Sequence, residues 1–481
     1  MNYKMMGRFV AQILTIGAVF MLPALFISLY YREDRAVYGF LLTLGIFAVV
    51  IGLLQLTCRS APSAFYAREG LVCVGVSWIV LSLLSCLPFY FSREIPKFID
   101  AFFEIVSGFT TTGASVLAKP ELLGHGVLFW RSFTHWIGGM GVLVFVLMVM
   151  PMNNDNSMHL VRAEVPGPTA GKLVPRMRTT SMILYGIYAA MTLILILLLL
   201  AFGMQPFDTF CIAFGTAGTG GFAVSSAGIA GYNSLAIEII LGIFMLLFGI
   251  NFNVYHLLLL RKFREAFSME EIKVYLGIAA FAVVSITVNI AGMVGNVGTA
   301  LRQAFFQVSS ILTTTGFSTV DYEAWPEYAK HLIVFLSLVG ACAGSTGGGF
   351  KVSRAIILVK SFFQEIRQII NPKEVITVRL DGKAVGGRTL ESTRIYAATY
   401  MVLICIFTLI LSLDGLDFTT NVTAVITCFN NTGPGLNLVG PMSNFSVYSD
   451  WAKVLLSFVM LTGRLEIFPM FLLFARSAHD R

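Results

Sequence analysis

The chain has 481 residues, of which 57% are hydrophobic and only 12% are charged. Since soluble domains carry about 25% charged residues, this composition excludes a soluble globular protein and predicts an integral membrane protein. The net charge of +7 calls for no nucleic-acid partner, because basic loops beside an anionic lipid leaflet account for it. Seven cysteines without paired spacing indicate neither a disulfide framework nor a zinc site.

Stretches without Asp, Glu, Lys or Arg predict ten membrane crossings. A helix needs about 20 residues to cross about 30 Å of hydrocarbon, and nine charge-free stretches reach or approach that length. They are residues 9–31, 36–58, 70–92, 132–154, 179–207, 239–260, 274–301, 331–350 and 395–413. A tenth stretch, residues 451–473, is interrupted by Arg464 and Glu466.

The basic residues predict the orientation. With a cytoplasmic N-terminus and ten crossings, 23 of the 33 Lys and Arg residues lie on the cytoplasmic side and nine on the outer side, while Arg464 lies within the membrane. This bias satisfies the positive-inside rule. We therefore expect both termini in the cytoplasm.

A thirteen-residue pattern occurs twice in the chain. Residues 101–113 read AFFEIVSGFTTTG and residues 304–316 read AFFQVSSILTTTG, with eight of the thirteen positions identical. Weaker copies follow at residues 215–222 (GTAGTGGF) and 429–435 (FNNTGPG). A unit of roughly a hundred residues, repeated in a hydrophobic chain, indicates an assembly built within one polypeptide.

We expect an all-α polytopic membrane protein in which an N-terminal helical hairpin precedes four pseudo-symmetric repeats around one pore. Each repeat holds a helix, a short pore helix, a loop and a second helix. The hairpin takes residues 1–69 and the repeats take residues 70–178, 179–273, 274–394 and 395–481.

One apolar segment in each repeat is too short to cross the membrane. These segments are residues 98–109, 208–217, 302–312 and 418–429, and lengths of 10–14 residues are typical of re-entrant helices. Asp100, Asp208 and Asp417 lie at the front of three of them, where we expect the carboxylates to cap exposed amides. The negative end of each short helix then points to the pore axis and favours a cation.

A loop rich in glycine and threonine follows each short helix. These four glycine loops are residues 110–115, 218–223, 313–319 and 430–435. Threonine supplies hydroxyl and carbonyl oxygens, and glycine permits the positive φ that turns consecutive carbonyls toward one axis, as in potassium-channel filters. Close helix packing is the alternative role of such residues, but the repeated position favours a cation-conducting pore.

The candidate filter is short, because the four loops share only one glycine each. We expect it to discriminate less than a symmetric TVGYG filter. Its residues, and the K⁺ site they form, are Thr111, Thr112, Gly113, Thr219, Gly220, Gly221, Thr314, Thr315, Gly316, Asn431, Thr432 and Gly433.

The chain resembles the Trk/Ktr/HKT superfamily of potassium transporters, specifically the membrane subunits of the bacterial TrkH/TrkG group. The resemblance covers essentially the whole length and includes the hairpin, the four glycine loops, the HWIGGMG sequence of residues 135–141, the glycine-rich residues 343–351 and Arg464. It implies potassium uptake with K⁺ as the transported ion and no bound cofactor. It also implies a homodimer in the inner membrane and a cytosolic nucleotide-binding subunit of the TrkA type, for which residues 261–273 and 361–394 are the expected docking surface.

Residues 340–349 (GACAGSTGGG), the 340–349 tract, hold five glycines. Glycine costs about 1 kcal/mol relative to alanine within a helix, so we expect the tract to interrupt the helix between residues 331–339 and 350–363. A phosphate-binding loop is disfavoured because neither GxxxxGK[ST] nor GxGxxG is present. Tight helix packing is an alternative role for these glycines. Resembling transporters gate the pore with this segment. The candidate gate residues are Gly344, Ser345, Thr346, Gly347, Gly348, Gly349 and Arg464.

Arg464 lies midway along the last predicted crossing. A cation there costs at least ~2.5–3.5 kcal/mol, so we expect it to face the pore, where it raises the barrier to cations or holds the 340–349 tract through its carbonyls. Glu466 lies on another helix face. The alternative is a purely structural role for Arg464, with a partner elsewhere in the chain such as Asn251.

A proton- or sodium-coupled potassium symporter is the main alternative function, since such proteins also use repeats and broken helices. Coupling typically needs a carboxylate within the membrane, and Glu104, Glu238 and Glu466 are the candidates. An enzyme is disfavoured because HExxH, GxSxG and paired catalytic carboxylates within a span are all missing from the sequence.

Overall fold

The computed structural model of the chain describes residues 3–58, 67–141, 177–374 and 376–474. The end of the charge-free stretch of residues 132–154 lies outside the described residues, as do some of the basic residues counted for the orientation, among them Arg162, Lys172 and Arg176.

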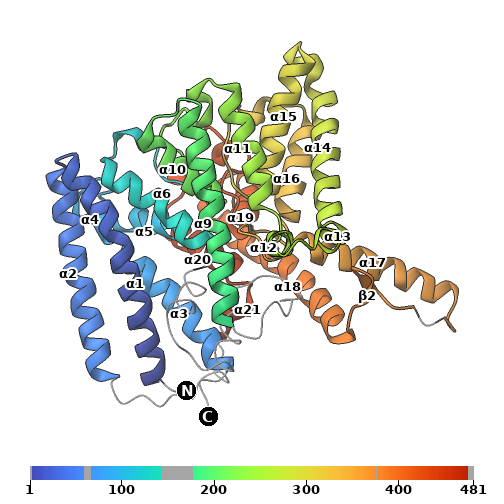
Figure 1. Cartoon of the computed structure of the whole chain (residues 1–481), viewed down its shortest axis with the longest axis horizontal. Coiled ribbons are helices and arrows are strands. Elements are labelled where there is room, and N and C mark those ends of the chain that lie inside the picture. Colours follow the sequence, from blue (N-terminus) through green and yellow to red (C-terminus); the bar gives the residue numbers. More distant parts are fainter. Residues whose placement is uncertain (1–2, 59–66, 142–176, 375, 475–481) are drawn as a thin grey trace.

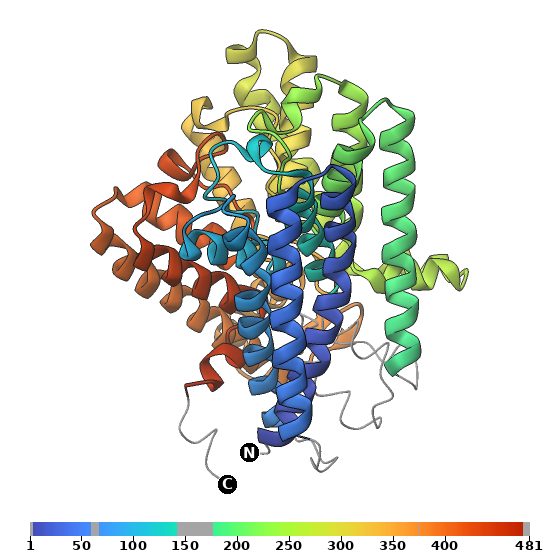
Figure 2. The ribbon, with the colours of Figure 1, turned by 90° about the vertical axis from the view of Figure 1, so that its left-hand side faces the viewer.

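Two long helices form a hairpin at one edge of the bundle (Figure 1, blue). They are α1 (Tyr3–Tyr30) and α2 (Asp34–Thr57), and they pack along each other while α1 also packs against α3 and α6. Figure 2 shows both running nearly parallel to the long helices behind them.

After the hairpin, a long helix, a shorter helix, a loop and a second helix recur four times along the chain, and in the last three repeats the described second helix has two parts. The long helices are α3 (Ala67–Ser85, continued by α4, Leu87–Phe91), α9 (Met177–Ala201), α14 (Glu270–Val294) and α18 (Gly387–Leu411). The shorter helices are α5 (Phe98–Phe109), α10 (Pro206–Ala217), α15 (Val297–Leu312) and α19 (Phe418–Phe429). The second helices are α6 (His125–Gly139), α11 (Leu235–Phe248) with α12 (Phe252–Leu259), α16 (Glu327–Val339) with α17 (Val352–Ile370), and α20 (Asp450–Arg464) with α21 (Phe468–Leu472).

The remaining elements are small. A short helix, α13 (Phe263–Ser268), precedes α14, and a two-stranded antiparallel hairpin, β1 (Arg379–Leu380) with β2 (Lys383–Ala384), follows α17. Single 3₁₀ turns lie in the loops between helices. Within the described residues the fold is therefore almost entirely helical.

Six helices in the described part of the chain are long and apolar enough to cross a membrane, and α11 with α12 makes a seventh, bent by 89°. Of the three remaining stretches, residues 331–350 contain the break that the 340–349 tract predicts, since α16 ends at Val339. The expectation of a continuous helix is wrong for residues 132–154 and 451–473, because α6 and α20 end at Gly139 and Arg464. A missing charge shows that a segment is apolar, but it does not show where the chain turns.

The same reason explains a second correction. The charge-free stretch of residues 274–301 is not one helix, since α14 ends at Val294 and Gly295 turns the chain with φ 73° before α15 begins at Val297. By contrast, α5 and α19 have the bounds that the sequence predicts.

Capping by aspartate is confirmed for only one short helix. Asp417 accepts a hydrogen bond from Thr420 N at 3.0 Å and caps α19. Asp100 instead pairs with Lys453, and Asp208 accepts from the Tyr232 hydroxyl at 2.8 Å. Both lie inside the first turn, where a side chain reaches a neighbouring element more easily than its own helix end.

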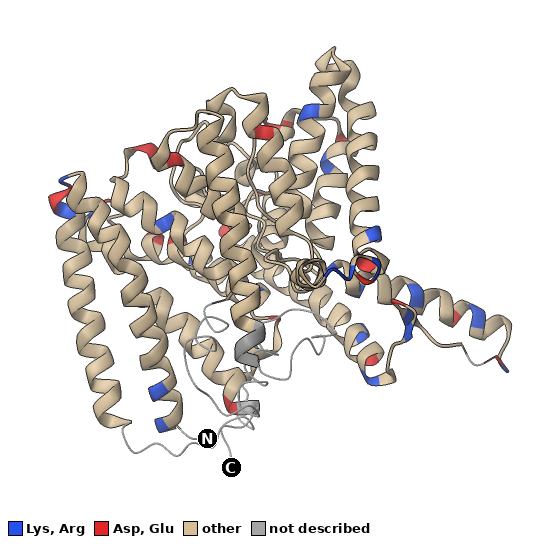
Figure 3. Ribbon diagram, viewed as in Figure 1, with Lys and Arg blue, Asp and Glu red and all other residues tan. Residues whose placement is uncertain are grey.

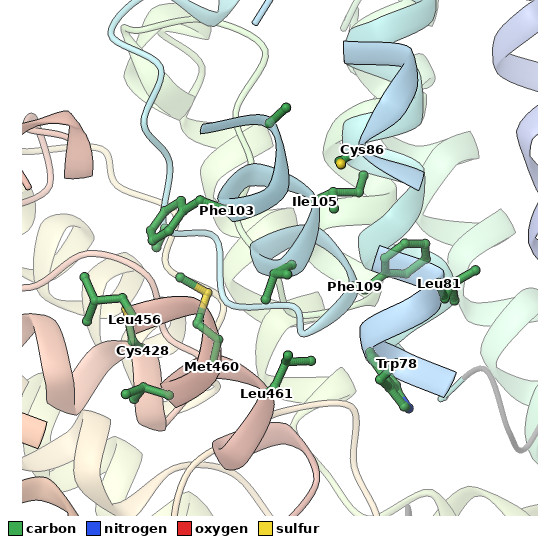
Figure 4. Close-up of a cluster of buried hydrophobic side chains, with 14 of the residues drawn as sticks. Trp78, Leu81, Cys86, Phe103, Ile105, Phe109, Cys428, Leu456, Met460 and Leu461 are labelled. Atoms are coloured by element: carbon green, nitrogen blue, oxygen red, sulfur yellow. The ribbon is translucent and has the colours of Figure 1, made fainter. Parts of the chain in front are cut away.

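Apolar side chains hold the short helix α5 at the centre of the bundle. Figure 4 shows Phe103 on the side of α5 that faces Leu456 and Met460 of α20, and Phe109 on the side that faces Trp78 and Leu81 of α3. Phe103 and Phe109 are fully buried. The side chains around α5 therefore fix the place where its C-terminal loop begins.

Charged residues gather toward the two ends of the bundle, and the middle of the long helices is mostly uncharged (Figure 3). This distribution fits a protein that crosses a membrane, because a charge within hydrocarbon is costly.

Candidate functional site

The four glycine loops have the same backbone conformation. Each holds a residue with positive φ followed two residues later by a glycine with positive φ. The pairs are Thr111 (54°) and Gly113 (78°), Thr219 (55°) and Gly221 (76°), Thr314 (57°) and Gly316 (85°), and Asn431 (55°) and Gly433 (93°). Four segments of different sequence thus form one repeated turn.

Each turn ends its short helix through the same two backbone hydrogen bonds. In the first loop, Thr111 N donates to Gly108 O at 3.1 Å and Thr112 N donates to Ser107 O at 2.9 Å, which is the Schellman pattern of a helix C-terminus. The equivalent donors in the other loops are Thr219 and Gly220, Thr314 and Thr315, and Asn431 and Thr432. These bonds use the N–H groups, and they leave the carbonyls of the turn free to face another direction.

Three of the turns place a β-branched residue in the left-handed region. Positive φ is a genuine outlier for threonine and costs of order 1–3 kcal/mol where the surrounding structure enforces it. Asn431 in the fourth loop adopts the same conformation more easily. Strain of this kind clusters at functional sites.

The four loops meet in a closed ring. A Cβ atom placed on Gly113 would lie 2.0 Å from Gly220 O, and one on Gly221 would lie 2.0 Å from Thr315 O. The ring continues, because a Cβ atom on Gly316 would lie 2.2 Å from Thr432 O and one on Gly433 would lie 2.7 Å from Thr112 O. The structure therefore brings all twelve predicted filter residues together, and no side chain fits at the four glycines.

A cavity lies on each side of the ring. The first has a volume of about 160 Å³ and is lined by Gly113, Gly221, Gly316 and Gly433 together with the loops that follow them. The second, of about 70 Å³, is lined by Gly139, Asn431 and Arg464 and by Ser345 and four glycines of the 340–349 tract. The glycine ring lies between these two spaces.

The 340–349 tract interrupts the helix between α16 and α17, as its glycines predict. It lies directly against the third and fourth glycine loops, because Gly348 N donates to Thr314 Oγ1 at 2.6 Å and a Cβ atom on Gly348 would lie 2.2 Å from Asn430 O. The tract also pairs with the bend of the second repeat, where Phe252 N donates to Gly344 O at 3.0 Å. All six predicted loop residues of the gate therefore lie beneath the ring.

A few charged side chains hold this tract. Arg464 donates to Thr346 O at 3.0 Å and to Gly138 O and Gly139 O at 2.5 and 2.9 Å. Glu271 accepts from Ala343 N at 2.7 Å and from Ser353 N at 3.2 Å, and Lys351 Nζ donates to Gly347 O.

Two roles were expected for Arg464: raising the barrier to cations, or binding the carbonyls of the 340–349 tract. The hydrogen bond to Thr346 O matches the second role. The side chain of Asn251 caps α12, where it accepts a hydrogen bond from Asn253 N at 3.0 Å. Glu466 pairs with Arg354 at 2.8 Å.

His135 packs behind the ring. Its imidazole is fully buried, lies 2.9 Å from Gly108 O through Nδ1, and its ring centroid is 4.1 Å from that of Phe222. A Cβ atom on Gly220 would collide with this imidazole at 2.2 Å. His135 therefore restricts which residues fit in the second loop.

Arg131 and Lys453 are two of the nine basic residues that the charge distribution assigns to the outer side, but both are buried. Lys453 Nζ lies 2.6 Å from Asp100 Oδ1 and ties α20 to α5. Arg131 Nε lies 2.6 Å from Glu104 Oε1. A signal for Arg131 was present, because it is the only charged residue in positions 122–154.

Comparisons with known proteins agree with this architecture. The chain matches the model of the TrkH family, described as cation transport protein, over residues 38–288 and 272–480. It is 35% identical to the Trk system potassium uptake protein TrkG of Escherichia coli K12, covering 95% of this chain and 94% of the relative. It is 33% identical to TrkH of the same strain over 98% and 99% of the two chains. The crystal structure of the potassium transporter TrkH from Vibrio parahaemolyticus aligns over all of both chains with a TM-score of 0.88 and 29% identity.

Proposed function

Because this chain belongs to the TrkH family of cation transport proteins, we propose that it takes up potassium across the bacterial inner membrane through a channel-like pore. The family is one of multi-pass membrane transporters rather than enzymes, and K⁺ is the transported ion. The observation that carries the proposal is the closed ring of four glycine loops between two cavities.

The ring serves as the ion filter. Four left-handed turns leave their carbonyl oxygens unused by the helix ends, and oxygen ligands at an axis replace the water shell of a bare cation. Each glycine contacts a carbonyl of the next loop, so the spacing of the loops cannot change without moving the whole ring. We assign K⁺ to the carbonyls of the twelve filter residues.

The 340–349 tract serves as the gate. It touches the ring at Thr314 and Asn430 and lies across the cavity beneath it. Arg464 holds it there by binding Thr346 O. In this closed arrangement a cation leaving the ring meets both the tract and a guanidinium group.

A channel accounts for the contacts better than a coupled symporter. Each candidate coupling carboxylate is already paired with an arginine: Glu104 with Arg131, Glu238 with Arg302 and Glu466 with Arg354, at 2.6, 2.6 and 2.8 Å. An arginine at this distance already balances the charge of the carboxylate and repels a second cation from it, which makes each carboxylate a poor site for a coupling ion.

We extend the proposal to the assembly. Both termini face the cytoplasm, and residues 1–69 form a hairpin beside the pore repeats 70–178, 179–273, 274–394 and 395–481. The protein works as a homodimer under a TrkA-type nucleotide-binding subunit, which docks on residues 261–273 and 361–394. The C-terminal half of the amphipathic helix α17 and the β1–β2 hairpin lie in the second of these segments and extend from the bundle (Figure 1).

Uptake of ⁸⁶Rb⁺ into liposomes that hold the purified protein tests the function. We expect uptake that potassium competes more strongly than sodium and that is unchanged by an imposed proton gradient. Uptake that requires the proton gradient would favour the symporter, and no uptake above protein-free liposomes would exclude a pore in this chain alone.

Deletion of residues 344–349 tests the gate in the same assay. We expect faster uptake, because the tract no longer lies beneath the ring. Unchanged uptake by a folded deletion variant would dismiss this segment as the gate.

A further inference from the structure

We propose that Arg131 and Glu104 act together as a positioning pair that sets the ion selectivity of the pore, by fixing the first and second glycine loops at the outer side of the ring. This inference rests on the proposed function. It assigns a role in selectivity to two residues outside the filter itself.

The pair is buried, and its hydrogen bonds go to the first glycine loop. Glu104 is fully buried and Arg131 is 2% exposed. Glu104 Oε1 accepts from Ser115 Oγ at 2.8 Å and from Arg131 Nε at 2.6 Å, and Oε2 accepts from Val116 N at 3.0 Å. Ser115 and Val116 follow Gly113 by two and three residues, so the carboxylate of α5 holds the segment that leaves the ring.

Arg131 connects the first glycine loop to the second. Its Nη1 donates to Ala223 O at 3.0 Å and its Nη2 reaches Ser115 Oγ at 3.2 Å. The guanidinium carbon also lies 3.5 Å from the centroid of the Phe222 ring, within cation–π range. Phe222 and Ala223 directly follow Gly221, so a single planar group joins the exits of two neighbouring loops.

The ion pair also affects the entry of cations, because the guanidinium charge lies next to the ion path. Arg131 lines the outer cavity together with Gly113 and Gly221. An unpaired guanidinium at that place repels an entering cation, and Glu104 cancels its charge at 2.6 Å. The positions of the first two glycine loops and the charge beside the ion path therefore depend on the same ion pair.

The third repeat shows that the turn itself does not require an ion pair. Gln307 occupies the position of Glu104 in the repeated thirteen-residue pattern, and its Nε2 donates to Ser318 Oγ at 3.2 Å. The turns at Gly316 and Gly113 nevertheless have the same backbone conformation. What the ion pair adds in the first repeat is the link to the second loop.

A buried ion pair is weak evidence for a contribution to stability, because desolvation offsets much of the attraction. The chain offers a matched control in Glu238 and Arg302, a pair with a 2.6 Å bidentate contact between α11 and α15. That pair borders an apolar pocket whose lining includes no glycine-loop residue. A substitution there tests the loss of an arginine–carboxylate pair without touching the loops.

The experiment measures the preference for potassium over sodium by bi-ionic reversal potentials in planar bilayers. In Arg131→Lys the charge remains but an ammonium cannot bind Glu104, Ser115 and Ala223 in one plane. We expect its potassium preference to fall by about threefold to tenfold, the range expected for losing one or two net hydrogen bonds. Ser115→Ala, which disturbs the fold least, is expected to shift the preference in the same direction by about twofold to threefold.

Glu104→Gln tests the electrostatic part. We expect lower potassium conductance, by about threefold or more, since the guanidinium next to the path is no longer cancelled. The double variant Glu104→Met with Arg131→Met removes both charges and is expected to recover conductance but not selectivity. Glu238→Gln is expected to leave both quantities as in the unmodified protein.

The outcomes separate this inference from the proposed function. If the unmodified protein conducts potassium selectively and both Arg131→Lys and Ser115→Ala keep its selectivity, the positioning role is wrong while the pore stands. Equal effects of Glu238→Gln and Glu104→Gln would also overturn it, because they would point to a general loss of stability. If the unmodified protein conducts no potassium, the proposed function itself fails.

Discussion

The ring of glycine loops and the 340–349 tract are both rich in glycine, but they are held in opposite ways. Each glycine loop is closed by two backbone hydrogen bonds onto its own helix, and each contacts the next loop, so four copies restrain one another. The tract exists once. Backbone hydrogen bonds such as the one from Cys342 N to Gly249 O tie it to the second repeat, and the side chains that hold it include Glu271, Thr314 and Arg464. We therefore expect the repeated contacts to make the ring rigid, and in the proposed gating the contacts of the tract, which occur only once, are the ones that are released.

The largest effect is expected from breaking the ring. Gly316→Ala adds a Cβ atom 2.2 Å from Thr432 O at a residue with φ 85°, so either the backbone or the neighbouring loop must move. We expect ⁸⁶Rb⁺ uptake to fall by about tenfold or more, because left-handed strain and a backbone collision act together.

Gly277→Ala is the matched control, because no atom lies within 4 Å of the added Cβ within α14. It is expected to keep the uptake and to raise stability by about 0.5–1 kcal/mol. Normal uptake by Gly316→Ala would contradict a ring that admits no side chain.

Removing the contact at the centre of the 340–349 tract is expected to raise ion flux, by less than Gly316→Ala lowers it. Arg464→Ala removes the donor to Thr346 O and the positive charge beneath the ring. We expect a severalfold rise in single-channel open probability or conductance, since hydrogen bonds to a charged group contribute about 1.5–3 kcal/mol. Arg464→Lys keeps the charge, and its conductance is expected to lie between those of the unmodified protein and Arg464→Ala. A drop in conductance for Arg464→Ala would reject a barrier at this place.

Loosening one end of the tract is expected to act more weakly. Glu271→Gln weakens the acceptor for Ala343 N and Ser353 N, and we expect uptake to rise by about twofold to tenfold. The neighbouring Glu270→Gln is the control, because Glu270 pairs with Lys360 of α17 at 2.5 Å and lies away from the tract. Equal changes in both variants would indicate that α14 has shifted as a whole.

The smallest effect concerns strain within the ring. Thr111→Asn places in the first loop the residue type that the fourth loop has at the same position, where φ is 55°. Because asparagine tolerates this conformation and the Thr111 hydroxyl has no hydrogen-bond partner in the described structure, we expect the free energy of unfolding to rise by about 1 kcal/mol. Thermal unfolding in detergent measures it, and a lower midpoint would show that the hydroxyl has another role.

Local sequence patterns predicted a large part of this architecture. The repeated AFFxxxSxxTTTG pattern located two of the short helices, and the bounds of α5 and α19 agree with the apolar segments read from the sequence. The five glycines of the 340–349 tract predicted the break between α16 and α17. These features depend on neighbours along the chain, and such neighbours are visible in the sequence.

Contacts between distant segments were beyond the sequence. Asp100 has the position of a helix cap but binds Lys453, which is 353 residues away, and Arg131 binds across to the loop at Ala223. The three intramembrane carboxylates looked equally available for coupling until their arginine partners were known.

The sequence by itself determined the class of protein, the four short helices and the glycine that each loop requires, because apolar length and positive φ are properties of local segments. The tertiary structure decided that the four loops close into one ring, which side chains restrain the tract beneath it, and which buried charges cancel. Those outcomes depend on distances between separate segments of the chain. The cost of burying a charge selects its partner only once those segments are packed together.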